Sequence, residues 1–264
     1  MQTFRGRPYR RKPGAADVTI LLTNDDGIAS PGLLALEKAM SRSNDVWVVA
    51  PESEKSGGSH SITLRDSIRV RSAGEKRFAC RGTPADCVMV AVLGLVPARI
   101  DCVISGINPS HNLGTDILYS GTAAGARQGA LMSVPSVALS VGAARAASDF
   151  APAAEFAARN LDIFRTLGTD DHFLNINFPV AGGTDAPTCI TFPARRIYRT
   201  ELHTCRAPDG DIYCFMGGAL PDALPEPGSD CMVLSEGRIS LSPIHAQPRN
   251  WVSMEESYRG VRFT

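Results

Sequence analysis

The sequence predicts an α/β protein with a mainly parallel sheet covered by helices on both faces, followed by a β-rich C-terminal extension. Three observations lead to this prediction. Over the first two thirds of the 264 residues, short β-branched runs alternate with helical patterns. These runs are apolar on both faces, as in sheets buried between helices. After about residue 180, proline, glycine and short strand-like pieces replace the alternation.

Five apolar runs are the expected strands of the main sheet. Each is short, rich in valine, isoleucine or leucine and bounded by polar or turn-forming residues, which is typical of buried strands. They span 18–23, 45–50, 100–106, 135–141 and 173–179, and a hairpin is expected around 62–81. Parallel sheets of this kind bind ligands at the carboxyl ends of their strands. The loops that follow residues 23, 50 and 105 are therefore the candidate site segments.

Four helical patterns alternate with these strands. Two of them begin with capping signals: Ser30 precedes Pro31, and Thr83 has Asp86 at capping-box spacing. The expected helices span 30–40, 83–96, 121–132 and 149–167, of which the last is the longest. With their strands they define one α/β domain over residues 17–180.

Residues 181–264 form the expected C-terminal extension. Strand-like pieces occur at 188–193, 196–201 and 211–216, and 231–244 is predicted to be a hairpin that turns at Glu236-Gly237. We expect this part to be a β-rich appendage packed on the α/β domain and extending to a partner subunit.

The composition disfavours several functional classes. Lys+Arg and Asp+Glu are equal at 27 each, so no net charge favours nucleic acid or an anionic membrane. No stretch approaches ~18 consecutive apolar residues, so no membrane span is predicted. Residues 1–16 are basic and lack the apolar core of a secretory signal, and we expect a disordered arm there.

The seven cysteines indicate a reducing compartment. Their number is odd, and none forms a C-x-x-C pair, so neither a disulfide framework nor a zinc site is expected. Cys87 and Cys102 lie inside apolar segments, where a thiol is usually a small core residue. We therefore predict a cytoplasmic protein.

Two adjacent carboxylates, Asp25 and Asp26, directly follow the first predicted strand in the stretch L-L-T-N-D-D-G. Such a pair at a strand-to-helix junction can supply hard oxygen ligands to Mg²⁺ or a similar cation. One aspartate could equally cap the next helix while the other is solvated, because aspartate is favoured at caps and turns. The motif alone leaves both interpretations open.

A Ser/Gly loop follows the second strand at the same predicted edge. Ser56 to Ser59 offer hydroxyls and a permissive glycine backbone that can wrap an anion or a metal-bound phosphate. The alternative is a flexible surface loop, and His60 is interpreted as a bystander.

The third segment is a loop of about 14 residues after the strand at 100–106, which is longer than usual connections and therefore typical of function. It contains Asn108, Asn112 and Asp116 and leads into a helix that begins at Ser120-Gly121-Thr122. Backbone N–H groups at such a helix start form an anion site, whereas the alternative is an Asn-rich turn.

Together, the carboxylate pair, the Ser/Gly loop and the helix start predict metal-assisted chemistry on a phosphate. The chain contains no P-loop, no G-x-G-x-x-G after a strand and no G-x-S-x-G elbow. Use of nucleotides as an energy source or redox carrier is therefore disfavoured.

At these residues the sequence resembles the SurE family of divalent-metal-dependent 5′(3′)-nucleotidases, also called stationary-phase acid phosphatases. Five motifs occur in the order and approximate spacing of the family, over about residues 18–180. They are ILLTNDDGI.SPG, VVAPE...SG.SHSIT, GTPADCV, VISGIN...NLG.DILYSGT.AGA and LNIN.P. A weaker C-terminal match is SEGRISLSPI.

The resemblance implies a Rossmann-like three-layer fold and a metal site. One divalent ion per subunit, Mg or Mn, would be held by Asp25, Asp26, Ser56 and Asn108. The substrate phosphate would be bound at Asn112, Ser120, Gly121 and Thr122. The family also implies homodimers or homotetramers built through the C-terminal extension. Two positions differ from the family pattern: Ser110 replaces a glycine, and Thr115 replaces a carboxylate.

The resulting hypothesis is hydrolysis of a nucleoside 5′- or 3′-monophosphate, with Asp25 and Asp26 as catalytic residues. Asp25 could be a metal ligand, a general base or a nucleophile. A non-catalytic metal- and nucleotide-sensing module is the rival from another class. A sugar-nucleotide transferase is a second enzymatic rival, although the Asp25-Asp26 pair does not have the D-x-D spacing usual for that class.

Overall fold

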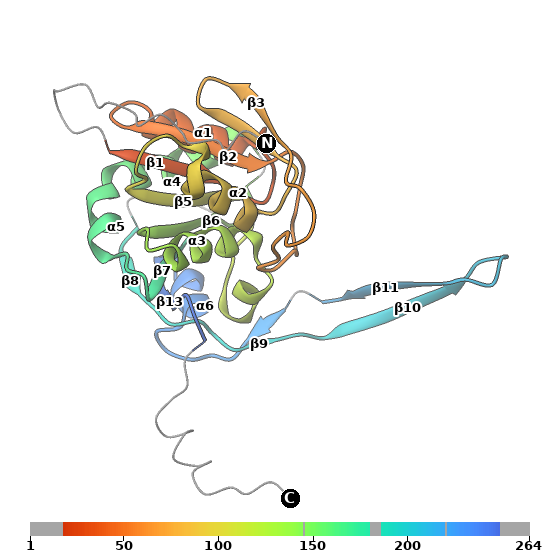
Figure 1. Cartoon of the computed structure of the whole chain (residues 1–264). Coiled ribbons are helices and arrows are strands. Elements are labelled where there is room, and N and C mark those ends of the chain that lie inside the picture. Colours follow the sequence, from red (N-terminus) through yellow and green to blue (C-terminus); the bar gives the residue numbers. More distant parts are fainter. Residues whose placement is uncertain (1–17, 145, 180–185, 220, 249–264) are drawn as a thin grey trace, which may run out of the picture.

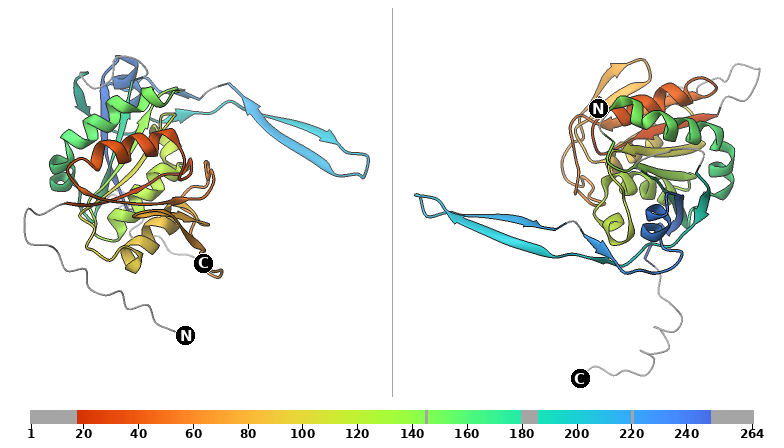
Figure 2. Two further views of the ribbon diagram at one scale, coloured as in Figure 1. Left: turned by 90° about the horizontal axis from the view of Figure 1, so that it is seen from above. Right: turned by 180° about the vertical axis from the view of Figure 1, so that it is seen from behind.

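A computed structural model describes residues 18–144, 146–179, 186–219 and 221–248. The body is a nine-stranded sheet with helices on both faces, and a long two-stranded arm projects from it (Figures 1 and 2). The predicted basic arm at 1–16 lies outside the described residues. None of the described helices combines the length and the apolar character needed to cross a membrane.

The centre of the sheet is parallel, as predicted. Its strand order is β3-β4-β2-β1-β5-β6-β7-β13-β8, and β4, β2, β1, β5, β6 and β7 all run in the same direction. These six strands are β4 Arg77–Cys80, β2 Asp45–Pro51, β1 Thr19–Thr23, β5 Cys102–Asn108, β6 Ser136–Val141 and β7 His172–Phe178. At one edge, β3 Val70–Gly74 pairs antiparallel with β4. At the other, β13 Ile239–His245 pairs antiparallel with β7 and parallel with β8 Thr188–Ile190.

Helices α1 Pro31–Met40, α4 Ala151–Arg159 and α5 Leu161–Leu167 cover one face of the sheet, and α2 Pro84–Val90 and α3 Gly121–Leu131 cover the other. Alternate residues of β1 show the two layers: Ile20 and Leu22 pack in the cluster under α1, α4 and α5, whereas Leu21 packs in the cluster under α2. Cys87 and Cys102 are buried, which confirms the predicted core thiols.

The predicted helix starts are correct at both capped helices. Ser30 accepts a hydrogen bond from the Leu33 backbone N–H at the start of α1. Thr83 and Asp86 form the expected reciprocal capping box at the start of α2, which continues into a π-helical turn, Ala91–Leu95. Local side-chain signals are sufficient here because a cap involves only residues within one turn.

The prediction of one long helix over 149–167 is wrong. A 3₁₀ turn, Ala147–Phe150, precedes α4, and the helical run breaks at Asn160 before α5. The Asn160 side-chain amide donates to the Phe156 carbonyl at 2.8 Å, one turn back. Asparagine competes in this way with the helix ladder, and the apolar pattern does not reveal it.

The predicted hairpin at 231–244 is also wrong in its first half. Residues Asp230–Ser235 form a short helix, α6, whose N-cap Ser229 accepts from the Met232 N–H. The chain turns at Gly237, which has a positive φ of 74°, before β13 joins the main sheet. A short apolar run does not distinguish a buried helix from a strand.

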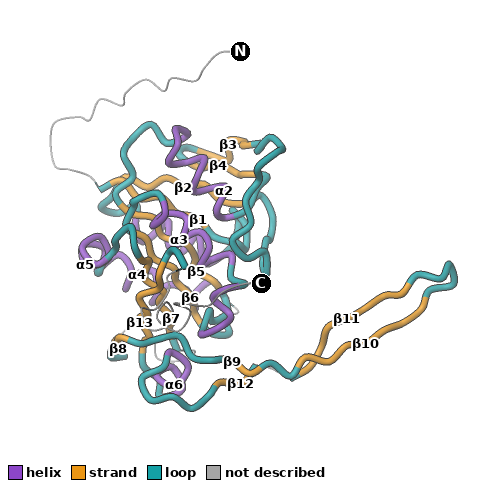
Figure 3. Tube along the Cα trace, turned by 60° about the horizontal axis from the view of Figure 1, so that its bottom comes forward, coloured by secondary structure: helices purple, strands orange, loops and turns teal. Residues whose placement is uncertain are grey.

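The arm consists of two antiparallel ladders in the C-terminal third. At its base, β9 Arg196–Ile197 pairs with β12 Asp222–Ala223. Beyond that, β10 Thr200–Arg206 pairs with β11 Ile212–Gly218, and every residue of both strands is exposed. Figure 3 shows this hairpin extending away from the body. The β-rich extension predicted from the sequence is present.

Candidate metal and phosphate site

Three polar segments meet at the carboxyl edge of the parallel strands. Asp25 and Asp26 follow β1, the loop carrying Ser56 follows β2, and Asn108 is the last residue of β5. Strands β2 and β5 are the two hydrogen-bonded neighbours of β1 in the sheet, so all three segments leave adjacent strand ends. The fold therefore places the four predicted metal ligands at the same edge of the sheet, after adjacent strands, and their joint binding of a metal stays a prediction.

Asp25 is buried, with 4% of its surface exposed, and lies against the start of α3. The Thr122 hydroxyl donates to its carboxylate at 2.5 Å. Burial raises the pKa of Asp25, while hydrogen bonds from Thr122 and from the Gly121 backbone lower it. The predicted anion-binding helix start thus holds the carboxylate of Asp25. The alternative, in which one aspartate caps the next helix, is not what the structure shows, because Ser30 is the N-cap of α1.

Gly121 is required by this close approach. A Cβ atom at this position would lie 2.7 Å from the Cβ of Asp25 and 2.8 Å from its Oδ2. Ser120 caps the same helix, because its hydroxyl accepts from the Ala123 N–H at 3.0 Å. The Ser120-Gly121-Thr122 segment and Asp25 therefore form one packed unit.

Asp26 adds a second carboxylate to this edge, and one of its oxygens accepts no hydrogen bond from the protein. Burial, followed by the charges of Asp25 and Glu54, raises the pKa of Asp26 to about 7. Its buried Oδ2 has no hydrogen-bond partner, and neither has the Oδ1 of the preceding Asn24. Unpaired buried oxygens are costly unless a cation or another donor satisfies them.

The Ser56 loop is attached to the site at both ends. The Lys55 N–H donates to the Asp25 carbonyl at 2.7 Å. This bond holds the backbone directly before Ser56 against the backbone of Asp25. The Ser59 hydroxyl donates to the Leu118 carbonyl at 2.7 Å. Ser56 itself is exposed. Hydrogen bonds therefore hold the loop both to Asp25, after β1, and to the segment before α3, while Ser56 stays exposed between these two attachments.

Asn108 is buried, and its side-chain amide is hydrogen-bonded within its own loop. Its Nδ2 donates to the Ser110 carbonyl at 2.7 Å and to the Ser110 hydroxyl at 3.1 Å. Because the side-chain nitrogen of Asn108 donates both bonds, its side-chain oxygen remains the atom that can bind a cation. Ser110, which departs from the family's glycine, thus supplies both contacts to the Asn108 amide, and the hydroxyl contact is the one that a glycine could not make.

Asn112 is buried, as are the other predicted phosphate residues. Its Nδ2 donates to the Ser140 hydroxyl at 2.8 Å, and its backbone N–H donates to Asn177. Its carbonyl accepts from the side chains of Asn175 and Asn177. One amide hydrogen of Asn112 is therefore committed to the scaffold, and its role toward phosphate stays a prediction.

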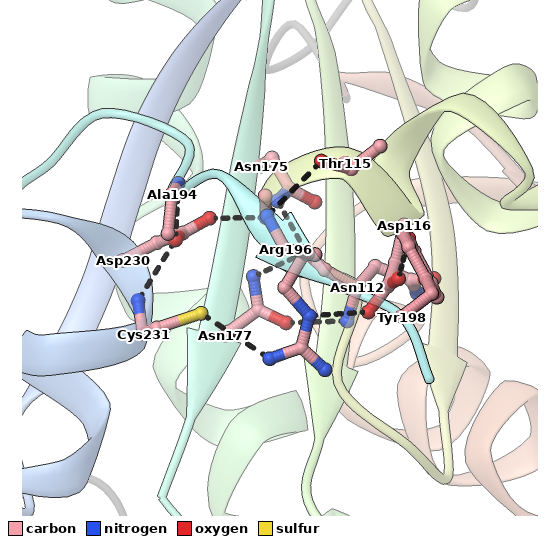
Figure 4. Close-up of polar contacts among 11 residues, drawn as sticks. Asn112, Thr115, Asp116, Asn175, Asn177, Ala194, Arg196, Tyr198, Asp230 and Cys231 are labelled. Atoms are coloured by element: carbon pink, nitrogen blue, oxygen red, sulfur yellow. Dashed lines mark hydrogen bonds and ion pairs between the residues drawn. The ribbon is translucent and has the colours of Figure 1, made fainter. Parts of the chain in front are cut away.

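Sequence reasoning missed the buried polar groups that hold this loop. Asn175 and Asn177 alternate along the buried strand β7, and this polar period of two was the available signal. Asp230, which is fully buried, accepts from the backbone N–H groups of Gly114, Ala194 and Cys231 (Figure 4). No local signal marked the role of Asp230, because two of its three partners, Gly114 and Ala194, lie in distant segments.

His60, interpreted from the sequence as a bystander, contacts the side chain of Gln128 on α3, and its role stays a prediction. Its Nε2 is 2.8 Å from the Gln128 Oε1, and burial lowers its pKa. Within the described ranges, no group of three or more His, Cys, Asp or Glu side chains is arranged to hold a metal. The predicted ligand set does not require one, since it combines two carboxylates with a hydroxyl and an amide oxygen.

The donor set fits a hard divalent cation. Adjacent carboxylates, a serine hydroxyl and an asparagine oxygen are the ligand types that Mg²⁺ and Mn²⁺ prefer. The neighbouring helix start presents a hydroxyl and backbone amides suited to phosphate oxygens. The fold and these residues thus define an α/β protein with a candidate carboxylate-based site for a cation and a phosphate at the carboxyl edge of its sheet.

Comparison with known proteins identifies the family. Residues 20–200 match the family model described as survival protein SurE. A 5′-nucleotidase SurE of Herpetosiphon aurantiacus is 42% identical over 246 residues, covering 89% of this chain and 96% of the relative. One from Caulobacter vibrioides is 41% identical over 242 residues, covering 86% and 89%.

A solved structure shows the same fold. The crystal structure of the SurE protein from Aquifex aeolicus superposes with a TM-score of 0.77 at 31% identity, covering 91% of this chain and 98% of that one. The chain belongs to the SurE family.

Proposed function

We propose that this protein is a divalent-metal-dependent phosphomonoesterase that hydrolyses nucleoside 5′-monophosphates, and also 3′-monophosphates, to nucleoside and phosphate. The observation that carries the proposal is the Asp25–Asp26 pair packed on the start of α3 with a buried carboxylate oxygen left unpaired. The relatives at 41–42% identity that are named 5′-nucleotidases support the same reaction.

The chain would hold one divalent ion per subunit, Mg or Mn, through Asp25, Asp26, Ser56 and Asn108. When bound, such an ion withdraws charge from a phosphoryl oxygen and activates or orients a water. Burial raises the pKa of Asp25, and burial together with the charges of Asp25 and Glu54 raises the pKa of Asp26; a cation at this edge would favour the ionised form of both carboxylates.

The remaining phosphate oxygens would be bound by the start of α3. Ser120, Gly121 and Thr122 supply hydroxyls and backbone amides there, and the helix dipole adds a favourable field for negative charge. Asn112 would complete this set from the adjacent loop. Asp25, which already contacts Thr122, would act at the junction of the metal and the phosphate as ligand, base or nucleophile.

We also propose that residues 181–264 act as an oligomerisation element of a homodimer or homotetramer, with residues 17–180 carrying the site. The arm exposes large apolar side chains on both strands, including Leu202, Phe215 and Met216. A two-stranded hairpin alone is marginally stable in water, so a second copy of the chain is the expected support. The cysteine pattern favours a cytoplasmic location, and the balanced charge gives no reason to expect nucleic acid or membrane as a partner.

The test is phosphate release from a panel of nucleoside monophosphates, measured with Mg²⁺, with Mn²⁺ and with a chelator. Metal-dependent release supports the hydrolase. Tight nucleotide binding without release would support the sensing module, and transfer of a sugar from a sugar nucleotide would support the transferase. Absence of release with either metal would contradict the proposal.

A further inference from the structure

A single turn before α3 connects the C-terminal arm to the phosphate-binding segment. This 3₁₀ turn, Gly114–Leu118, lies in the long loop that follows β5. Its central residue Asp116 points toward the chain segment that enters the arm, where it meets Arg196 and Tyr198 (Figure 4). The turn is therefore in contact with both regions.

Arg196 and Tyr198 hold the carboxylate of Asp116 from the base of the arm. The Arg196 Nε is 3.1 Å from the Asp116 Oδ2, and the Tyr198 hydroxyl donates to the other oxygen, Oδ1. Arg196 also donates its backbone N–H to the Thr115 hydroxyl at 3.2 Å. Arg196 begins β9, and only Arg199 separates Tyr198 from β10. A displacement of the arm would therefore reach Asp116 directly.

On its other side, the turn fixes both halves of the site. The Asp116 carbonyl accepts from the backbone N–H of Ser120 at 3.1 Å, and Ser120 is the N-cap of the helix that contacts Asp25. The Leu118 and Tyr119 carbonyls accept from the hydroxyl and N–H of Ser59, in the loop that carries Ser56. The position of one turn thus sets a phosphate segment and a metal-ligand loop.

The first residue of the turn is held separately, by a buried group. Gly114 donates to the fully buried Asp230, and a Cβ at Gly114 would lie 2.2 Å from the Ala194 carbonyl oxygen. That attachment is part of the packed interior. The Asp116 contacts are partly solvent-exposed, with 27% of its side chain and 16% of the Arg196 side chain accessible. Loss of the exposed contacts would therefore disturb the end of the turn without unfolding its start.

We propose that Asp116 is a positioning residue, and that Arg196 and Tyr198 couple the arm to the phosphate-binding segment through it. The inference rests on the proposed phosphatase function. The carboxylate of Asp116 touches no reacting group in this arrangement. The Asp116 carboxylate holds the turn in the position in which the Ser120–Thr122 helix start and the Ser56 loop lie on either side of Asp25.

The experiment compares Tyr198→Phe and Arg196→Lys with a matched control, Tyr213→Phe, a tyrosine exposed on β11 of the same arm. Each full-length variant is assayed for nucleotide hydrolysis, for inhibition by inorganic phosphate and for thermal stability. We expect the first two variants to raise KM and the phosphate inhibition constant about three- to tenfold, the scale of one hydrogen bond, with a smaller change in kcat. Tyr213→Phe should match wild type.

A double variant distinguishes coupling from a general loss of structure. If Tyr198 acts through Asp116, then Asp116→Ala/Tyr198→Phe should weaken phosphate binding no more than Asp116→Ala alone. Additive effects, or wild-type KM and phosphate inhibition in Tyr198→Phe and Arg196→Lys, would overturn the inference. If Arg196→Lys does not fold, Tyr198→Phe decides, because it removes a single hydroxyl.

Failure of the proposed function would give a different result. In that case wild type itself releases no phosphate with Mg²⁺ or Mn²⁺, and calorimetric titration with inorganic phosphate replaces the kinetic readout. Equal phosphate affinity in wild type and Tyr198→Phe would then overturn the coupling on its own.

Discussion

Strands β7 and β10 have the same length, seven residues, and opposite environments. Six residues of β7 are buried, because the strand lies between β6 and β13 in a sheet covered on both faces. All seven residues of β10 are exposed, because that strand pairs only with β11. Both strands contain apolar and polar side chains. The difference teaches that burial follows from the layers that a strand joins, more than from its own composition.

The two regions also divide the expected tasks. The candidate site is built from the ends of central strands and the start of α3, where packing on all sides restricts movement. Residues Arg196 and Tyr198 at the base of the arm contact Thr115 and Asp116, in the turn that precedes α3. We therefore expect changes in the body to alter chemistry and stability, changes in the β10–β11 ladder to alter assembly, and changes at Arg196 or Tyr198 to act on phosphate binding through Asp116.

The largest expected effect is on the chemistry of the body. Asp25→Asn should lower kcat for nucleoside monophosphates by at least about 100-fold, because it removes a ligand charge and any base or nucleophile at that position. Oligomeric state and thermal stability should change little, since the amide is isosteric. Wild-type turnover in the purified variant would remove Asp25 from the mechanism.

A pair of identical substitutions tests the contrast in burial. Leu22→Ala, in the core, should lower the free energy of unfolding by about 2–5 kcal/mol through lost burial and a cavity. Leu202→Ala, in the exposed arm, should lower it by less than about 0.5 kcal/mol under conditions where the protein is monomeric. Denaturant unfolding at several protein concentrations measures both. Equal losses would show that the arm is packed as tightly as the core.

Assembly is expected to respond only to the arm. Leu202→Asp should shift the protein toward smaller species in sedimentation velocity, because it places a charge opposite Met216 on the exposed ladder. Glu201→Gln, on the adjacent residue and the other face of the hairpin, is the matched control and should leave the distribution closer to wild type. An unchanged distribution in Leu202→Asp would place the interface elsewhere.

The smallest expected effect is on the pH dependence of stability. Burial, followed by the charge of Arg196, lowers the pKa of His111, whose Nε2–H donates to the Phe178 carbonyl. The native protein therefore favours neutral His111, and its contribution to stability is complete above about pH 6.5 and is lost as pH falls below that value. His111→Gln should reduce the loss of melting temperature between pH 7.5 and pH 5.5.

His203 in the arm supplies the control for that measurement. It is exposed, so folding changes its surroundings little, and His203→Gln should retain the wild-type pH dependence. A His111→Gln variant with the same pH slope as wild type would contradict the assignment of that slope to the buried imidazole.

Much of the α/β body could be predicted because its signals are local. Apolar runs marked β1, β2, β5, β6 and β7, and the caps at Ser30 and Thr83 marked where helices begin. The errors arose where a nearby side chain or a distant strand overrides such signals. Asn160 divides a continuous helical pattern, and α6 occupies an apolar run that the sequence alone fits equally well to a strand.

The sequence by itself determined the family, the parallel sheet and the identity of the candidate ligands. Each of these was inferred from short motifs or apolar runs, and every such motif or run lies within about one element. Only the tertiary structure decided which of these residues meet. Asp25 and Thr122 are 97 positions apart and share a hydrogen bond, and Asp116 and Tyr198 are joined across 82. Such contacts depend on how the layers stack and where loops leave the sheet, and the residues at either end carry no local pattern that names the other.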